Sequence, residues 1–163
     1  MDIRPASPSD AAAIAAIYNA EVTGATTTFD LVPRTLAEQL TWIDEHRGPY
    51  PAIVAIQAGE VVGFGSLSRY HTRPAYATTV EDSVYVAATA RGRGIGHLLL
   101  DELVSLACAH GFHTILARIV GDNAGSVALH RSCGFIQVGV EREVGRKFGR
   151  WLDVSILQKM LGA

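Results

Sequence analysis

Three glycines at alternating positions, Gly92, Gly94 and Gly96, separate a predicted strand from a predicted helix. The valine-rich residues 79–86 have strand character, and the leucines of 98–106 recur at helical spacing. At such a junction, successive backbone N–H groups can point into a concavity whose positive potential is strengthened by the helix dipole. The loop therefore predicts a binding site for an anion, with phosphate as the expected group.

The spacing of the loop excludes two common phosphate-binding motifs. A P-loop needs a Lys-Ser or Lys-Thr pair after its last glycine, and none follows here. A dinucleotide fingerprint needs glycine where His97 stands, and the next strand has no acidic residue to hold a ribose. A plain glycine turn without a ligand is the remaining alternative, and Arg91 and Arg93 between the glycines argue against it.

Segments of strand and helix character alternate along the chain without a linker, repeat or low-complexity stretch. Strands are expected at 2–4, 52–56, 61–67, 79–86, 114–120, after Phe135 and at 151–157, and helices after Ser7, after Thr35, at Gly96 and over 124–133. The mixed order predicts an α/β (α+β) fold. The length of 163 residues, 48% of them hydrophobic, suits one domain over 1–163.

The charge and hydropathy of the chain limit the classes of partner that it is expected to bind. A net charge of −2 gives no reason to expect nucleic acid or an anionic membrane surface, because both bind clustered positive charge. No apolar run reaches about 18 residues, and the first ten residues lack the apolar stretch of a signal peptide. A cytoplasmic protein with a small-molecule ligand is expected.

The cysteines and histidines show no metal-binding spacing. Cys108 and Cys133 are expected to be buried, reduced packing residues, since they form no CxxC motif. Five histidines outside the predicted site share no common face, and no metal is expected; they are His46, His71, His97, His110 and His113.

Two motifs in register carry a resemblance to a known superfamily. Arg91-x-x-Gly94-x-Gly96 resembles the pyrophosphate loop of the Gcn5-related N-acetyltransferases (GNAT). Downstream, Asn123-Ala124-Gly125-Ser126 leads through a short helix to Gly134-Phe135, as in that superfamily. The resemblance implies a strongly twisted mixed sheet flanked by helices, with the cofactor in a V-shaped split between two central parallel strands.

Further stretches are similar to one branch, the phosphinothricin and methionine sulfoximine acetyltransferases. They cover essentially the whole chain and comprise 3–6, 73–76, 79–86, 126–130 and 145–153. Members of this branch are commonly homodimers, so the resemblance implies a homodimer here as well.

The resemblance assigns the cofactor site to acetyl-coenzyme A. It places the pyrophosphate on the glycine loop, which comprises Arg91, Gly92, Arg93, Gly94, Ile95 and Gly96. The pantetheine arm would lie beside the backbone of Val84, Tyr85 and Val86. Asn123 and Ser126 would contact the cofactor from the start of the following helix. Asn123 is also a good helix N-cap, and from the residues alone that role is favoured. One side chain can fill both roles.

Two residues are candidates for proton transfer. Glu81 is acidic in an otherwise apolar strand, and burial there would raise its pKa toward that of a useful base. The alternative is a solvated carboxylate on the outer face of the strand; the match to the family glutamate favours the base. His130 stands where many superfamily members have a tyrosine that protonates the leaving thiolate. It can act as the acid or be a satisfied structural histidine.

The acceptor pocket is assigned by resemblance to a polar loop. Arg73 would bind a carboxylate and Tyr76 would wall the pocket, with solvated loop residues as the alternative. Phe29 is a weaker candidate for the same pocket, since a lone aromatic residue usually belongs to the core. The turn 147–150, with Lys147, Phe148 and Arg150, can close over the site, join a dimer interface or be a solvated hairpin tip.

The function implied is acetyl transfer from acetyl-coenzyme A to the α-amine of a small amino acid analogue such as phosphinothricin, methionine sulfoximine or methionine sulfone. The amine would attack the thioester directly, without a covalent enzyme intermediate, because no nucleophile-and-base arrangement is visible. A protein or peptide N-acetyltransferase and a non-catalytic acyl-coenzyme A sensing module are the alternatives.

Overall fold

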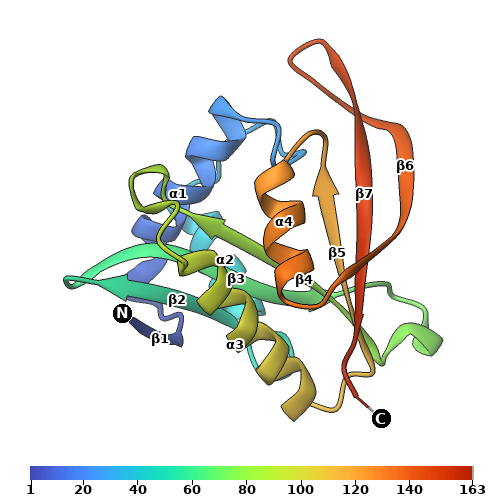
Figure 1. Cartoon of the computed structure of the whole chain (residues 1–163). Helices are drawn as coiled ribbons and strands as arrows, with labels where there is room; N and C mark the ends of the chain where they lie inside the picture. The colour runs from blue at the N-terminus through green and yellow to red at the C-terminus, as the bar shows by residue number, and fades with distance from the viewer. Residues whose placement is uncertain (163) are drawn as a thin grey trace.

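The computed structural model describes residues 1–162, so Ala163, the last residue of the predicted domain, lies outside the described residues. A seven-stranded mixed sheet has the order β1-β2-β3-β4-β5-β7-β6 (Figure 1). Its strands are β1 (Asp2–Pro5), β2 (Ala52–Gln57), β3 (Glu60–Arg69), β4 (Thr79–Val86), β5 (Thr114–Val120), β6 (Ile136–Lys147) and β7 (Arg150–Met160). The α-helices within the described range are α1 (Ala11–Gly24), α2 (Leu36–Glu45), α3 (Ile95–Ala109) and α4 (Ala124–Ser132). The predicted α/β class is confirmed.

Local hydrogen bonds explain where the first two helices begin. The Ser7 N–H donates to the Asp10 carboxylate at 2.8 Å, just before α1. Ahead of α2, the Glu38 N–H donates to Thr35 Oγ1 at 3.2 Å and the Thr35 N–H donates to Glu38 Oε2 at 2.8 Å. Each capping box satisfies N–H groups that would otherwise lack partners. The box at Thr35 begins α2, whereas the box at Ser7 begins a 3₁₀ helix, Pro8–Asp10, that leads into α1 at Ala11.

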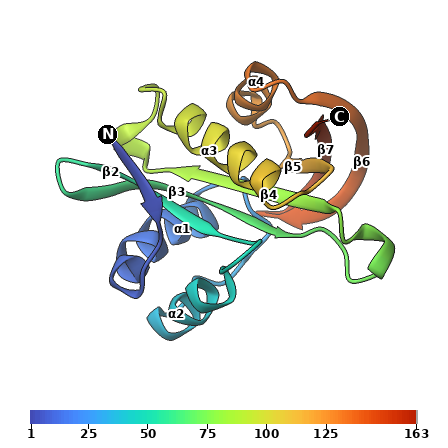
Figure 2. The same cartoon turned by 90° about the horizontal axis from the view of Figure 1, so that it is seen from below.

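The helices cover both faces of the sheet. Figure 2 shows α1 and α2 on one face and α3 and α4 on the other. Helix α3 approaches β3 closely at Gly65, where a Cβ would lie 2.9 Å from Leu103 Cδ1 and 3.2 Å from the Ser83 carbonyl oxygen. The glycine therefore allows the apolar face of α3 to pack directly on the strand. This contact belongs to the larger of the two main hydrophobic clusters.

The central parallel strands diverge after a short paired segment. Strand β4 pairs with β5 only over Thr79–Glu81 against 114–116. Beyond this segment β4 continues along β3 up to Val86, while β5 continues along β7 up to Val120. The sheet is therefore open between β4 and β5, and the V-shaped split implied by the resemblance is present.

The expectation for the two cysteines is half correct. Cys133 is buried, whereas Cys108 is exposed on α3 with its Sγ 3.3 Å from the Leu161 carbonyl oxygen. The apolar stripe of α3 faces the sheet through other positions, so Cys108 points away from the core.

No helix within residues 1–162 has the length and apolarity needed to cross a membrane.

Candidate active site

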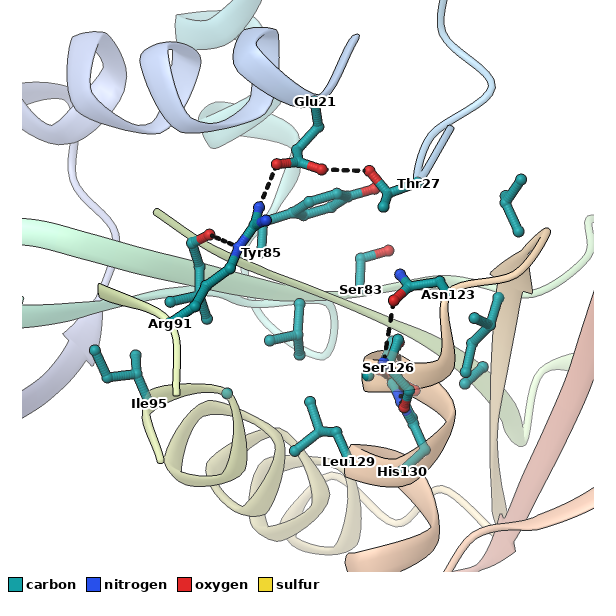
Figure 3. Close-up of a pocket in the computed structure, with 18 of the residues that line it drawn as sticks. Glu21, Thr27, Ser83, Tyr85, Arg91, Ile95, Asn123, Ser126, Leu129 and His130 are labelled. Atoms are coloured by element: carbon teal, nitrogen blue, oxygen red, sulfur yellow. Dashed lines mark hydrogen bonds and ion pairs between the residues drawn. The ribbon is translucent and has the colours of Figure 1, made fainter. Parts of the chain in front are cut away.

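A cavity of about 460 Å³ occupies the split between β4 and β5 (Figure 3). Its walls come from residues 82–86 of β4, the loop 90–96, residues 117–120 of β5 and the first two turns of α4. Glu21 and Thr27 close it on the α1 side. The cavity is thus an elongated slot that ends at the glycine loop.

The glycine loop has the backbone geometry of an anion cradle. Gly92 and Gly94 have φ values of 72° and 79°, which side-chain-bearing residues rarely adopt. Gly94 is the N-cap of α3, and the first main-chain helix bond runs from Leu98 N to Gly94 O. The N–H groups of the first turn are thereby left for a ligand. At Gly96 a Cβ would lie 3.1 Å from Leu129 Cδ2, so this glycine lets α3 and α4 approach each other beside the slot.

Arg91 connects the glycine loop to two neighbouring elements. Its Nε donates to the Val86 carbonyl oxygen at 3.1 Å, and its Nη2 forms an ion pair with Glu21. The other Glu21 carboxylate oxygen accepts a 2.6 Å hydrogen bond from Thr27 Oγ1. Arg91 therefore ties the loop to β4 and to the end of α1. Arg93 is exposed and does not line the slot.

The remaining predicted cofactor residues line the slot as expected: Val84, Tyr85, Val86, Arg91, Gly92, Gly94, Ile95, Gly96, Asn123 and Ser126. Asn123 is indeed the N-cap of α4, because its Oδ1 accepts the Ser126 N–H at 3.2 Å. Its capping role and its position in the slot are compatible.

His130 is buried and bonded on both ring nitrogens. Nδ1 lies 2.7 Å from the Ser126 carbonyl oxygen, which can only accept, and Nε2 lies 2.9 Å from Asp82 Oδ2. Burial alone would lower the pKa of His130, but the hydrogen bond and charge of Asp82 outweigh it and raise the pKa. Since the Ser126 carbonyl oxygen only accepts, Nδ1 carries a proton, and a protonated Nε2 would donate the second hydrogen bond to Asp82.

Asp82 is a site residue that the sequence reasoning missed. Its Oδ1 is buried without a hydrogen-bond partner among residues 1–162, and the residue lines the slot. The available signal was a second acidic residue directly after Glu81 in an apolar strand.

Glu81 lies on the opposite face of β4 from Asp82, since successive strand residues alternate. It occupies the last paired position of the two parallel strands, opposite Leu116. Burial raises the pKa of Glu81, while the charge of Arg118 counteracts this and that of Asp82 adds to it. Glu81 is partly buried, and the expected direction of its pKa shift, upward, is met. Glu81 does not line the cofactor slot, so an acceptor has to reach it from the α1 and α2 side of the sheet.

Arg73 and Tyr76 lie outside the slot. Arg73 precedes the short 3₁₀ helix Pro74–Tyr76, and both side chains are exposed. Phe29 is also partly exposed, and its ring packs on the backbone of Gly145. The slot instead contains Arg118, which was missed although it is the charged residue of the apolar run 114–120.

The turn 147–150 is not uniformly solvated. Lys147 is buried, and its Nζ donates to the Thr28 carbonyl oxygen at 2.9 Å and to the Glu21 carbonyl oxygen at 3.4 Å. Burial lowers the pKa of Lys147. The alternative of a solvated tip is therefore wrong for Lys147, which fastens the hairpin to the segment after α1, whereas Phe148 and Arg150 are exposed.

One histidine belongs to a polar cluster between α3 and α4. His97 Nε2 lies 3.1 Å from Asp101 Oδ2, and His97 Nδ1 lies 3.4 Å from Cys133 Sγ. These three residues are close enough to share an ion, but they lie outside the slot, and we assign no metal to them.

A slot between diverging parallel strands that ends at an anion-binding glycine loop is the arrangement that the resemblance implies for an acyl-coenzyme A-dependent transferase. Residues 3–156 match the acetyltransferase (GNAT) domain, and the chain belongs to this family. It is an acetyl-coenzyme A-dependent N-acetyltransferase, which confirms the resemblance stated above.

Named relatives lie in the expected branch. The chain is 41% identical to the phosphinothricin N-acetyltransferase of Streptomyces coelicolor, with 99% of this chain and 96% of that protein covered. It is 42% identical to the L-methionine sulfoximine/L-methionine sulfone acetyltransferase of Pseudomonas aeruginosa, with coverages of 96% and 92%. A crystal structure of the phosphinothricin acetyltransferase of Sinorhizobium meliloti in complex with acetyl-coenzyme A superposes with a TM-score of 0.95 at 39% identity, with coverages of 99% and 88%.

Proposed function

We propose that this enzyme acetylates the α-amine of a small amino acid analogue of the phosphinothricin, methionine sulfoximine or methionine sulfone type. The observation that carries the proposal is Glu81, a partly buried carboxyl with a raised pKa at the point where the sheet opens. At that point Glu81 can accept a proton from an amine that approaches from the α1 and α2 side of the sheet. The names of the relatives supply the acceptor class.

In the proposed reaction, both substrates bind before chemistry begins. Glu81 takes a proton from the acceptor ammonium, and the neutral amine attacks the thioester carbonyl, whose oxygen is polarised by backbone amides at Val84–Val86. The carbon–sulfur bond then breaks, the proton lost from the new amide nitrogen passes to the departing thiolate, and His130, which lines the slot, orients that sulfur. Neither Cys108 nor Cys133 lines the slot, and burial raises the pKa of Cys133, which supports direct transfer without a cysteine intermediate.

The loop residues Arg73 and Tyr76, together with Phe29, are proposed to contact the acceptor from outside the slot. We also propose that residues 1–163 act as one domain in the cytoplasm, where acetyl-coenzyme A is made and used.

A homodimer is proposed on the character of the outer strands. Strand β6 is at the edge of the sheet, and β6 and the start of β7 expose large apolar side chains: Ile136, Val138, Val140, Val144 and Trp151. An exposed apolar edge strand is a surface that a second copy can cover.

Glu81→Gln tests the proposal in a thiol-release assay against amino acids, sulfones, sulfoximines, polyamines and short peptides. We expect kcat to fall by about 10²- to 10⁴-fold while coenzyme A binding is unchanged. Glu102→Gln, on the exposed side of α3, is the matched control and should keep full activity. Unchanged turnover in Glu81→Gln would remove Glu81 from the mechanism. Wild-type turnover with peptides but with no free amino acid would contradict the acceptor class, and binding without turnover of any acceptor would indicate a sensing module.

A further inference from the structure

Arg118 stands on the same face of the sheet as Glu81. Glu81 is in register with Leu116, and Arg118 is two residues further along β5, so all three side chains project from one face. The charge of Arg118 acts on the Glu81 carboxyl, and Arg118 also lines the slot. A cation therefore lies beside the proposed base, just beyond the point where the two parallel strands part.

Two other cations, one lining the slot and one buried close to Glu21, are already engaged. Arg91 is bonded to Glu21 and to the Val86 carbonyl oxygen, and Lys147 is buried among backbone carbonyls. Arg118, in contrast, has a side chain that is 36% exposed. Its environment leaves room for a ligand.

A carboxylate from the neighbouring hairpin orients Arg118. Its Nη2 lies 2.5 Å from Glu141 Oε1, across β7 on strand β6. No other side-chain partner of the guanidinium is found within residues 1–162. Since a guanidinium has five N–H donors, the group retains donors for a second acceptor oxygen while Glu141 holds it in place.

We propose that Arg118 binds the carboxylate of the acceptor and thereby selects free amino acids over simple amines. The inference rests on the proposed function and adds the contact that determines specificity. An amino acid carries its amine and its carboxylate on one carbon, so it needs a base and a cation close together on one face. Glu81 and Arg118 supply that pair, and a planar guanidinium suits a carboxylate better than an ammonium does.

The test compares two acceptors that differ in the carboxylate alone: methionine sulfone and its decarboxylated amine, 3-(methylsulfonyl)propylamine. Arg118→Met should lower kcat/KM for methionine sulfone about 10- to 100-fold, the loss expected for a charge-assisted hydrogen bond. For the amine the loss should be several-fold smaller, because that acceptor lacks the group Arg118 binds and is affected only through the pKa of Glu81, which the Arg118 charge lowers. Arg118→Lys should fall between the wild type and Arg118→Met. KM for acetyl-coenzyme A should be unchanged.

Arg142→Met is the matched control, since Arg142 is an exposed arginine on the same hairpin next to Glu141. Equal losses for both acceptors in Arg118→Met would mean a structural role and would overturn the inference. So would equal retention of both activities, or a carboxylate-dependent loss that appears in Arg73→Met and not in Arg118→Met. If the wild type acetylates neither acceptor nor any other amino acid, the proposed function fails instead, which is a distinguishable result.

Discussion

Replacing Asp82 tests whether the pair with His130 is a buried ion pair. The two side chains are 1% and 4% exposed, and the Nε2 to Oδ2 distance is 2.9 Å. Asp82→Ala leaves a buried imidazole nitrogen without a partner, and removal of one member of a buried pair costs about 3–5 kcal/mol of unfolding free energy. Asp82→Asn can still bond Nε2 as a neutral donor. It exchanges a charged hydrogen bond for a neutral one, so we expect a loss of only about 1–2 kcal/mol.

The loss of unfolding free energy in Asp82→Asn should depend on pH. Because the folded-state pKa of His130 is raised, the stabilisation by Asp82 is fully present below the unfolded-state value of about 6.5. It is lost as the pH rises through the raised folded-state pKa. The cost of Asp82→Asn should therefore be larger at about pH 6 than at about pH 9.

Urea unfolding with linear extrapolation, carried out on wild type and both variants at these two pH values, measures the differences directly. A buried ion pair is ruled out if Asp82→Ala and Asp82→Asn lower the unfolding free energy by the same amount, or if the loss in Asp82→Asn grows with pH. Either result would mean that His130 is not held as an imidazolium by Asp82.

Two further predictions concern Glu21, near the end of α1, and Gly145, the β6 residue on which the Phe29 ring packs. Glu21→Gln removes the negative charge that pairs with Arg91. The KM for acetyl-coenzyme A should therefore rise about 3- to 10-fold, while the KM for the acceptor changes little. An unaltered KM for acetyl-coenzyme A would show that the Arg91 ion pair does not position the loop. Gly145→Ala places a Cβ within the present volume of the Phe29 ring, so the ring must move. The unfolding free energy should fall by about 1–2 kcal/mol and acceptor KM should rise; a stability loss without a change in acceptor KM would separate Phe29 from the acceptor pocket.

Much of the fold could be predicted because it depends on neighbours in sequence. The capping boxes at Ser7 and Thr35 bond groups three residues apart, and the glycine loop follows from backbone conformations that glycine favours. Alternation and helical spacing likewise indicated the strands and helices on either side of the loop. The slot at the glycine loop was predictable for the same reason, since loop, strand and helix start are contiguous in the chain.

The partners of charged side chains depended on the tertiary structure. Arg91 was expected at the pyrophosphate, yet its ion pair is with a residue 70 positions earlier. His130 meets Asp82 across 48 positions, and Lys147 is buried against a segment more than 100 positions away. The face of β5 that carries Arg118 became a site only because β4 and β5 part beside it. The sequence alone determined where strands, helices and the glycine loop form, because those choices are made by local hydrogen bonds and backbone conformation. Tertiary structure decided which charges meet and which are buried, because burial and ion pairing depend on how elements far apart in the chain pack together.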